Sequence, residues 1–231
     1  MSKAVVLPNH VGLILDGNRR WAKDQGLPAL EGHRAGYANL KTITKHAVNR
    51  GVIYISAYIF SAENWNRTKE EVAYLLDLAL WVATREVREV HKEGIRVLFL
   101  GRRDGLSEKL LTAIQKAEEL TKDNTRGTLA LCFNYGGQQE IVDAAQRLID
   151  ASNKPKSLTL EEFAGVLYAP DVPAVDLVIR TSGEQRLSNF MLWRAAYAEL
   201  YFVKKHWPAF TIDDFDDALT EFANRQRRFG K

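Results

Sequence analysis

The stretch Val11-Gly12-Leu13-Ile14-Leu15-Asp16-Gly17-Asn18-Arg19-Arg20-Trp21 is an apolar run that stops abruptly at a carboxylate, a glycine and two arginines. Asp16 and Asn18 favour turns and Gly17 permits unusual backbone angles, which predicts a strand, a tight turn and a helix. Two arginines at the positive end of a helix dipole need an anion beside them. Backbone N–H groups, guanidinium groups and a carboxylate suit a diphosphate with Mg²⁺, although turn statistics alone favour an ordinary turn with solvated arginines.

The composition predicts one globular domain spanning residues 1–231. Hydrophobic residues make up 46% of the chain, and 32 Lys+Arg against 29 Asp+Glu leave a net charge of +3. Such a small excess does not indicate nucleic-acid binding. The single Cys132 forms no internal disulfide, and we see neither a signal peptide nor an apolar run long enough to span a membrane. We therefore expect a cytoplasmic protein.

Strand-like and helix-like segments alternate along the whole chain. This order predicts an α/β fold with a central, mostly parallel sheet flanked by helices on both faces and ligands at the carboxyl ends of the strands. Strands are predicted at residues 11–15, 52–60, 95–100, 128–133, 176–180 and 200–203. Helices are predicted after the first turn and at residues 32–50, 68–94, 107–121, 138–150, 159–167, 190–195 and 213–224.

Polar clusters follow four of the predicted strands, at residues 16–20, 61–67, 134–137 and 180–188. Parallel strands would gather these clusters at one edge of the sheet. Guanidinium groups fit phosphate oxygens, so an anion site is favoured over five separate solvated charges. The residues that we expect to face this site are Arg19, Arg20, Arg67, Arg180, Arg186 and Ser188.

Other phosphate and metal sites are poorly supported. The chain has neither a P-loop motif nor a G-x-G-x-x-G fingerprint after a strand, and its five histidines lack the spacing of zinc ligands. Mg²⁺ held by a carboxylate and by the phosphates of a substrate is the better match, with Asp16 as the first candidate. The aromatic residues near the clusters belong either to the core or to an apolar part of the site: Trp21, Phe60, Trp65, Tyr135 and Trp193.

Several longer motifs closely resemble the cis-prenyltransferases, the undecaprenyl diphosphate synthase family, and the resemblance covers nearly the whole chain. They are His10-Val11-Gly12-Leu13-Ile14-Leu15-Asp16-Gly17-Asn18-Arg19-Arg20-Trp21-Ala22, Gly32-His33-Arg34-Ala35-Gly36, Phe60-Ser61-Ala62-Glu63-Asn64-Trp65-Asn66-Arg67, Asn134-Tyr135-Gly136-Gly137 and the segment from Asp176 to Phe202.

The resemblance implies Mg²⁺-dependent condensation of isopentenyl diphosphate with an allylic diphosphate such as farnesyl or geranyl diphosphate. The product would be a cis-polyprenyl diphosphate, a bacterial carrier-lipid precursor. It also implies a homodimer, a hydrophobic tunnel for the growing chain and peripheral contact with the inner face of the membrane when the product leaves. A non-catalytic subunit of a heteromeric prenyltransferase and a phosphate-binding hydrolase are the alternatives.

By matching position, Asp16 is the expected Mg²⁺ carboxylate, with Glu199 assisting, and Asn64 is expected to take part in proton removal. The allylic diphosphate would contact Gly17, Asn18, Arg19, Arg20 and His33, and isopentenyl diphosphate would contact Arg180, Arg186 and Ser188. Ser61, Asn64, Trp65 and Arg67 match a mobile catalytic segment, and Arg228 and Gly230 match a tail that reaches a neighbouring subunit. The other expected substrate-binding residues are Trp21, Phe60, Ala62, Glu63, Glu71 and Leu187.

Two positions depart from the family pattern. Ala29 lies where many bacterial members carry an arginine, and Gln185 stands where some relatives have histidine. Ile59 falls at a tunnel position that is often small in long-chain members, so our hypothesis is that it shortens the product. The alternative is that its bulk is absorbed elsewhere in the tunnel, with Gly127 opening space.

Overall fold

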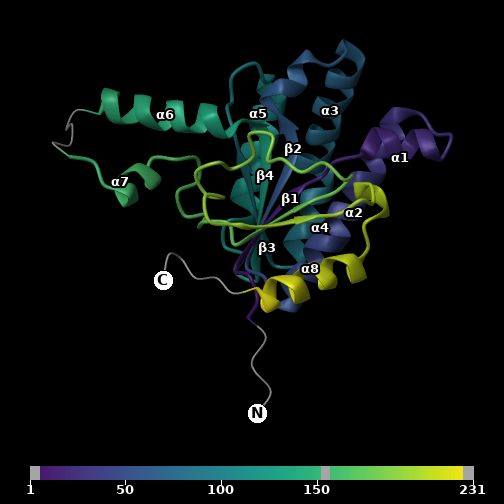
Figure 1. Ribbon diagram of the computed structural model, residues 1–231. Helices are drawn as coiled ribbons and strands as arrows, with labels where there is room; N and C mark the ends of the chain where they lie inside the picture. Colours follow the sequence, from purple (N-terminus) through teal and green to yellow (C-terminus); the bar gives the residue numbers. More distant parts are fainter. Residues whose placement is uncertain (1–5, 152–156, 226–231) are drawn as a thin grey trace.

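The computed structural model describes residues 6–151 and 157–225, with strands and helices alternating along the chain (Figure 1). The strands are β1 (His10–Ile14), β2 (Tyr54–Ser61), β3 (Ile95–Leu100), β4 (Gly127–Tyr135), β5 (Leu177–Arg180) and β6 (Glu199–Phe202). The α-helices are α1 (Asn18–Asp24), α2 (Ala29–Arg50), α3 (Lys69–Trp81), α4 (Val87–Lys92), α5 (Glu108–Thr121), α6 (Gly137–Asp150), α7 (Leu160–Ala164) and α8 (Ile212–Asn224).

The strands form one sheet in the order β3-β4-β2-β1-β5-β6, and every neighbouring pair is parallel. The predicted α/β fold is therefore confirmed. Because all strands run the same way, their carboxyl ends share one edge of the sheet. The register places Ile14 of β1 opposite Tyr58 of β2 and Arg180 of β5, which brings the chain segments that follow these strands together.

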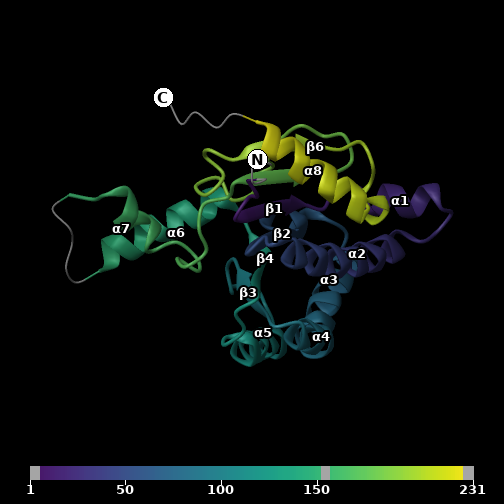
Figure 2. The same ribbon diagram turned by 90° about the horizontal axis from the view of Figure 1, so that it is seen from below.

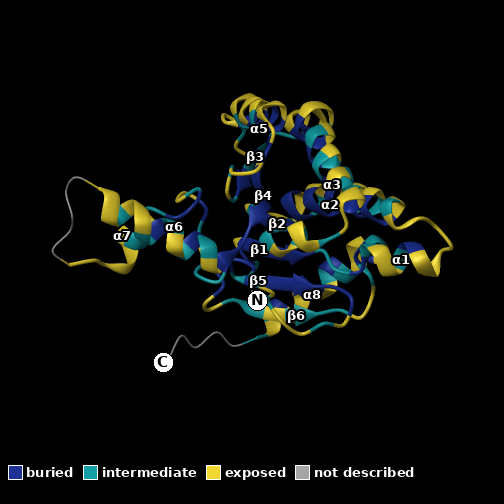
Figure 3. Ribbon diagram, turned by 90° about the horizontal axis from the view of Figure 1, so that it is seen from above, coloured by how far each residue is buried: buried dark blue, intermediate teal, exposed yellow. Residues whose placement is uncertain are grey.

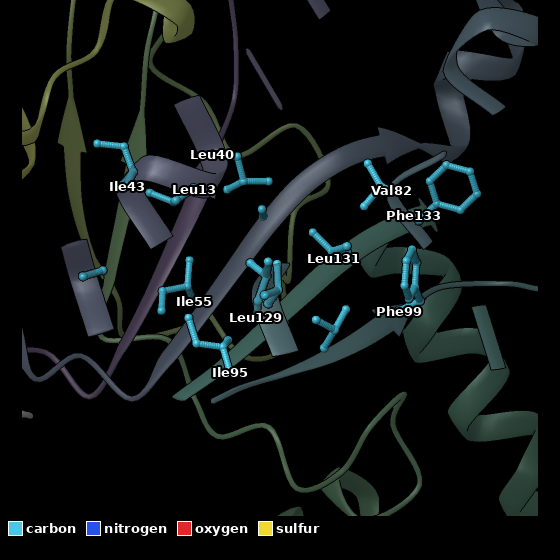
Figure 4. Packing of buried hydrophobic residues seen from close by; sticks show 14 of the residues in the cluster. Leu13, Leu40, Ile43, Ile55, Val82, Ile95, Phe99, Leu129, Leu131 and Phe133 are labelled. Atoms are coloured by element: carbon cyan, nitrogen blue, oxygen red, sulfur yellow. The ribbon is translucent and has the colours of Figure 1, made fainter. Parts of the chain in front are cut away.

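Helices α2, α3, α4, α5 and α8 pack on one face of the sheet. Their apolar residues join those of the strands in the larger buried cluster, where Leu40 and Ile43 of α2 gather with Leu13, Ile55 and Leu129 of the strands (Figure 4). Strands β1, β4 and β5 are buried along their whole length, whereas the outer sides of the helices are exposed, as Figure 3 shows. This layer holds most of the hydrophobic core.

The opposite face is covered largely by irregular chain. Residues of the segment 165–198, among them Tyr168, Phe190 and Met191, form a second buried cluster with the sheet. Helices α6 and α7 belong to this side of the molecule and extend away from the sheet (Figures 1 and 2). The helix predicted at residues 190–195 was wrong, because this stretch forms turns and Met191 has a φ of 43°.

The helix predicted at residues 68–94 is not a uniform α-helix. Thr68 caps α3 by accepting a hydrogen bond from the backbone N–H of Glu71, as its sequence position predicted. A π-helical segment, Val82–Glu86, then separates α3 from α4. Two 3₁₀ helices, Ala62–Asn66 and Trp207–Ala209, were not predicted. The helix predicted at 159–167 ends at Ala164.

No helix within residues 6–151 and 157–225 combines the length and apolar content needed to cross a membrane.

A buried ion pair organises the irregular layer. Glu140 of α6 accepts a hydrogen bond from Arg194 Nη1 at 2.7 Å and from the Tyr135 hydroxyl at 2.5 Å. The same guanidinium donates to the carbonyl oxygens of Val172, Tyr168 and Ala169. These bonds replace the backbone pairing that a regular helix would supply, since buried polar groups need partners.

Replacing Glu140 with Gln should lower the free energy of unfolding by about 3–5 kcal/mol, because it leaves the buried Arg194 charge without a counter-ion. Urea denaturation measures the change. Glu119→Gln is the matched control, since it removes an exposed partner of Lys122 and should leave the urea midpoint unchanged. Equal midpoints for both variants would contradict the assigned role of the buried pair.

Candidate active site

Asp16 lies just beyond β1 and is held between two arginines. Its Oδ1 accepts a hydrogen bond from Arg20 Nη2 at 3.0 Å, and its Oδ2 accepts one from Arg180 Nη2 at 2.9 Å. Burial raises the pKa of Asp16, but the hydrogen bonds and charges of Arg180 and Arg20 outweigh burial and hold it below its ordinary value. Asp16 is therefore an anion at neutral pH.

Arg180 joins three parts of the site although its side chain is only 5% exposed. Besides Asp16, its guanidinium contacts Ser188 Oγ at 2.8 Å and the backbone carbonyl of Arg186. Ser188 has a φ of 48°, a conformation that is uncommon outside glycine. The loop after β5 is thus folded back around the arginine that ends the strand.

A polar recess of about 670 Å³ opens in front of Asp16 and Arg180. It brings together residues from the ends of β1, β2 and β5, as the parallel sheet requires. Asp16 and Glu63 are the carboxylates among its described lining residues. The other polar residues that line it are Ser61, Asn64, Arg67, Gln138, Arg180, Ser188 and Asn189.

A second charged cluster surrounds the buried carboxylate of Glu71 on α3. Its oxygens lie 2.6 Å from Arg67 Nη1, 3.2 Å from Arg19 Nη1 and 3.2 Å from His33 Nε2. Burial raises the pKa of Glu71, but these neighbours, Arg67 foremost, hold it below its usual value. Burial, together with the charges of Arg67 and Arg19, lowers the pKa of His33 more than Glu71 raises it, so the ring is mostly neutral at pH 7. The cluster joins α1, α2 and α3.

The segment after β2 forms a 3₁₀ helix, Ala62–Asn66, beside the recess. Asn64 Oδ1 accepts a hydrogen bond from the backbone N–H of Ser61 at 3.1 Å, and Trp65 Nε1 donates to Asn134 Oδ1 at 2.8 Å. Glu63 accepts a bond from Asn189, which lies in the loop after β5. Two of the predicted strand-end clusters, residues 61–67 and 134–137, are therefore linked by a hydrogen bond, and Glu63 connects the first of them to the loop after β5.

An apolar cavity of about 120 Å³ adjoins the polar recess and lies between α2, α3 and the sheet. Leu15, Tyr58, Asn64 and Arg67 line both spaces, so they mark the boundary between them. The apolar walls of the cavity include Leu40, Ile59, Leu75, Leu78, Ala79, Val82, Phe99, Leu131 and Phe133. Ile59 occupies the wall position that the sequence predicted for it.

Not every predicted site residue joins this arrangement. Glu199 starts β6 opposite Leu177, about 10 Å along the strand from the level of Arg180, and its carboxylate pairs with Arg225. The sheet therefore does not bring Glu199 to Asp16 within one chain. Arg228 and Gly230 lie outside the described residues.

The arginines differ in their placement. Arg67 and Arg180 line the recess, and Arg20 reaches it through Asp16. Arg19 instead pairs with Glu71, and the exposed Arg186 pairs with Glu184 at 2.6 Å. The predicted gathering of five arginines is only partly realised.

Several predicted aromatic and apolar residues pack against other side chains and line neither the recess nor the apolar cavity. Phe60 is buried against Phe133 and Trp65, and Trp193 packs on Phe163. Tyr135 is buried, and Leu187 packs against the second core cluster. Trp21 and Ala62 are absent from the described lining of both the recess and the apolar cavity.

The glycines and Asn18 of the turn pack closely. Gly17 has a φ of 97°, and a Cβ on Gly36 would lie 2.4 Å from Asn18 Oδ1. Asn18 Nδ2 donates to the carbonyl of Leu15, and the buried Oδ1 has no hydrogen-bond partner among the described residues. Asn18 thus lines the apolar cavity, and its Oδ1 is a hydrogen-bond acceptor without a donor among the described residues.

The sequence prediction missed Asn189, Gln138 and Glu184. Asn189 links Glu63 to the loop after β5, and Gln138 lines the recess at the start of α6. Glu184 lies 3.7 Å from Arg20 and pairs with Arg186. The one feature of the sequence that could have identified these three residues is their position shortly after the end of a predicted strand.

The donor set fits Mg²⁺ only if the ligand contributes oxygens. Within the described residues, no group of three or more His, Cys, Asp or Glu side chains is arranged to hold a metal. One or two protein carboxylates with substrate phosphates are a common Mg²⁺ environment, and the ionised Asp16 at the recess meets that requirement.

A family model described as "Putative undecaprenyl diphosphate synthase" matches residues 14–230. The chain belongs to the undecaprenyl diphosphate synthase family. An isoprenyl transferase from Thermotoga maritima is 50% identical over 226 residues, which cover 97% of each protein. A trans,polycis-polyprenyl diphosphate synthase of Thermobifida fusca, specific for (2Z,6E)-farnesyl diphosphate, is 46% identical over 97% of this chain and 81% of its own length.

The fold of this cis-prenyltransferase matches solved relatives. The structure of lavandulyl diphosphate synthase from Lavandula x intermedia in complex with dimethylallyl diphosphate superimposes with a TM-score of 0.92. Its sequence is 35% identical, and the match covers 97% of this chain and 99% of the other. The predicted family and enzyme class, a prenyltransferase, are confirmed.

Replacing Asp16 with Asn should lower the free energy of unfolding at pH 7 by about 1.5–3 kcal/mol, the scale of hydrogen bonds to charged groups. Because the folded pKa of Asp16 lies below its unfolded value, the ion pairs stabilise fully above the unfolded value. Their contribution is lost as pH falls through the folded value. Urea titrations from pH 7 to pH 2.5 should show the difference between wild type and variant closing in acid, and a constant difference would contradict this assignment.

Proposed function

We propose that this enzyme condenses isopentenyl diphosphate with an allylic diphosphate, in the presence of Mg²⁺, to form a cis-polyprenyl diphosphate. One observation carries the proposal: the clamped carboxylate of Asp16 stands in a polar recess that adjoins an apolar cavity and shares four lining residues with it, Leu15, Tyr58, Asn64 and Arg67. A molecule with a diphosphate head and a hydrocarbon tail matches both spaces. The name of the Thermobifida relative and the dimethylallyl diphosphate bound by the lavender enzyme support the same substrate class.

The residues of the recess stabilise the departing diphosphate. Breaking the allylic carbon–oxygen bond leaves negative charge on the diphosphate, and fixed guanidinium groups bind that charge more strongly as it develops. Arg180 and Arg67 line the recess, and Arg20 reaches it through Asp16. Arg19 pairs with Glu71, the carboxylate that also holds Arg67. Asp16 would hold Mg²⁺, which supplies further charge neutralisation on the leaving group.

The apolar cavity and Asn64 complete the chemistry. Leu75, Phe99 and Leu131 exclude water from the hydrocarbon part of the allylic substrate, where positive charge develops. Once the new carbon–carbon bond has formed, a proton must be lost from the carbon of the isopentenyl unit beside the cationic centre to give the new double bond. Asn64 lies at the boundary between the two spaces and is placed to assist this step. Its side chain is already oriented by the backbone N–H of Ser61.

We further propose a homodimer that works in the cytoplasm and contacts the membrane at its inner face, supplying a carrier-lipid precursor. Among the described strands, β6 is an edge strand, and uncovered edges invite pairing with another chain. Next to it Tyr197 is 76% exposed, and Leu160 on α7 is 71% exposed. A second copy of the chain would cover these residues, which supports the dimer.

The test is incubation with Mg²⁺, labelled isopentenyl diphosphate and allylic primers of different length. An extended lipid product supports the proposal, and the absence of product from every primer refutes it. Phosphate released without a lipid product would identify a hydrolase. Product formed only after a second subunit is added would identify a non-catalytic partner.

Asp16→Ala should abolish condensation, because it removes the carboxylate that faces both arginines and the metal. Arg180 keeps its bonds to Ser188 and to the carbonyl of Arg186, so the fold should persist at pH 7. Product formation is measured with the labelled substrate, and light scattering and circular dichroism check mass and fold. Retained condensation by the folded variant would overturn the assignment.

Ile59→Ala should lengthen the product, since it removes three carbon atoms from the wall of the apolar cavity. Chromatography of the dephosphorylated products measures chain length. Leu78→Ala enlarges the same cavity from α3 and shows whether space alone controls length. An unchanged product distribution for Ile59→Ala would contradict the hypothesis.

A further inference from the structure

Ser182, His206 and Asp24 form a chain of polar side chains behind the turn that carries Asp16. Ser182 Oγ lies 2.7 Å from His206 Nδ1, and His206 Nε2 lies 3.4 Å from Asp24 Oδ2. These are the residue types of a hydrolytic triad. However, Ser182 is buried, and a Cβ placed on Gly17 would lie 2.7 Å from its Oγ. The hydroxyl is therefore packed against the turn rather than presented as a nucleophile.

The His206 ring contacts the turn directly. A Cβ on Gly17 would lie 2.5 Å from Nδ1 and 2.9 Å from Cγ, so the ring occupies the space on that side of the backbone. The next peptide reinforces this contact, because the N–H of Trp207 donates to the carbonyl of Asp16 at 2.9 Å. His206 thus stands behind the residue pair Asp16 and Gly17.

The same segment holds the loop that follows Arg180. The N–H of Ser182 donates to the carbonyl of Lys205 at 2.8 Å, and that of Gly183 donates to the carbonyl of Val203 at 2.9 Å. Thr181 Oγ1 closes the arrangement by donating to the carbonyl of Asp16 at 2.8 Å. The imidazole therefore lies where the turn after β1 and the loop after β5 meet.

Both backbones are held in left-handed conformations at this point. Gly17 has a φ of 97° and Ser182 a φ of 78°. A serine in this region is unfavourable unless its surroundings hold it there. The hydrogen bond between Ser182 Oγ and His206 Nδ1 is the side-chain part of that restraint, added to the backbone bonds of Ser182 and Gly183. Losing it should loosen the loop, so that a ligand has to order it on binding.

We propose that His206 is a positioning residue that preorganises the diphosphate-binding turn through Gly17 and Ser182. It does not contact the substrate. Its Nδ1 bonds to Ser182 and so holds the loop after β5 in place. Its Nε2 faces the carboxylate of Asp24 at the end of α1, which orients the imidazole ring. The inference rests on the proposed function, because that function makes a diphosphate the ligand of this turn.

The test compares His206→Phe, His206→Asn and wild type in two measurements. Calorimetric titration with inorganic diphosphate and Mg²⁺ gives Kd, and steady-state assays give kcat and the KM of both substrates. His206→Phe should raise Kd and KM about tenfold and leave kcat within about twofold, the pattern of lost preorganisation. His206→Asn should recover most of the affinity, because its amide places a polar atom near the position of Nδ1.

His46→Phe is the matched control. His46 is a partly exposed histidine on α2, paired with Asp216 at 2.9 Å, about 20 Å along the helix from His33. It should leave Kd and KM unchanged. A purely structural role of His206 would lower kcat through loss of folded enzyme without raising KM, and that result overturns the proposal.

Unchanged Kd and KM in His206→Phe also overturn it, as does an Asn variant as weak as the Phe variant. If the wild type binds inorganic diphosphate but forms no lipid product, the proposed condensation fails, while the Kd values still decide the role of His206.

Discussion

The ion pair between Asp16 and Arg180 is the contact on which the arrangement of the site depends. Arg180 ends β5 almost fully buried, and a buried guanidinium requires a counter-ion and hydrogen-bond acceptors. Asp16, at the end of the adjacent β1, supplies the charge and accepts from Nη2, while Ser188 and the carbonyl of Arg186 accept from Nη1; the buried Nε has no partner among the described residues. The turn after one strand and the loop after its neighbour are thereby fixed to each other.

Next to this ion pair, a polar space and an apolar space lie directly beside each other. The recess beside Asp16 is lined by polar groups, whereas the cavity behind Leu15 and Tyr58 is closed by aliphatic and aromatic side chains. Electrostatic interactions are strong at such a boundary because little water reaches the apolar side. An enzyme that must stabilise a departing diphosphate and shield a hydrocarbon cation needs both environments side by side.

The two faces of the sheet were predictable to different degrees. The helices on the first face follow regular apolar spacing, so α2, α5 and α8 were anticipated to within about three residues at each end. The segment 165–198 has no such periodicity, and its conformation depends on buried partners distant in the chain, such as the pair of Arg194 with Glu140. Local propensity predicted a helix there, but tertiary hydrogen bonds stabilise turns instead.

The sequence by itself determined the alternation of strands and helices, the parallel sheet and the edge at which Asp16, Asn64 and Arg180 meet. These features follow from local apolar periodicity and from the rule that parallel strands end together. Only the tertiary structure decided which charges pair: Arg19 with Glu71, Arg186 with Glu184, and Glu199 with Arg225 away from Asp16. Ion pairs depend on register and side-chain reach between distant segments, and neither quantity is encoded in local spacing.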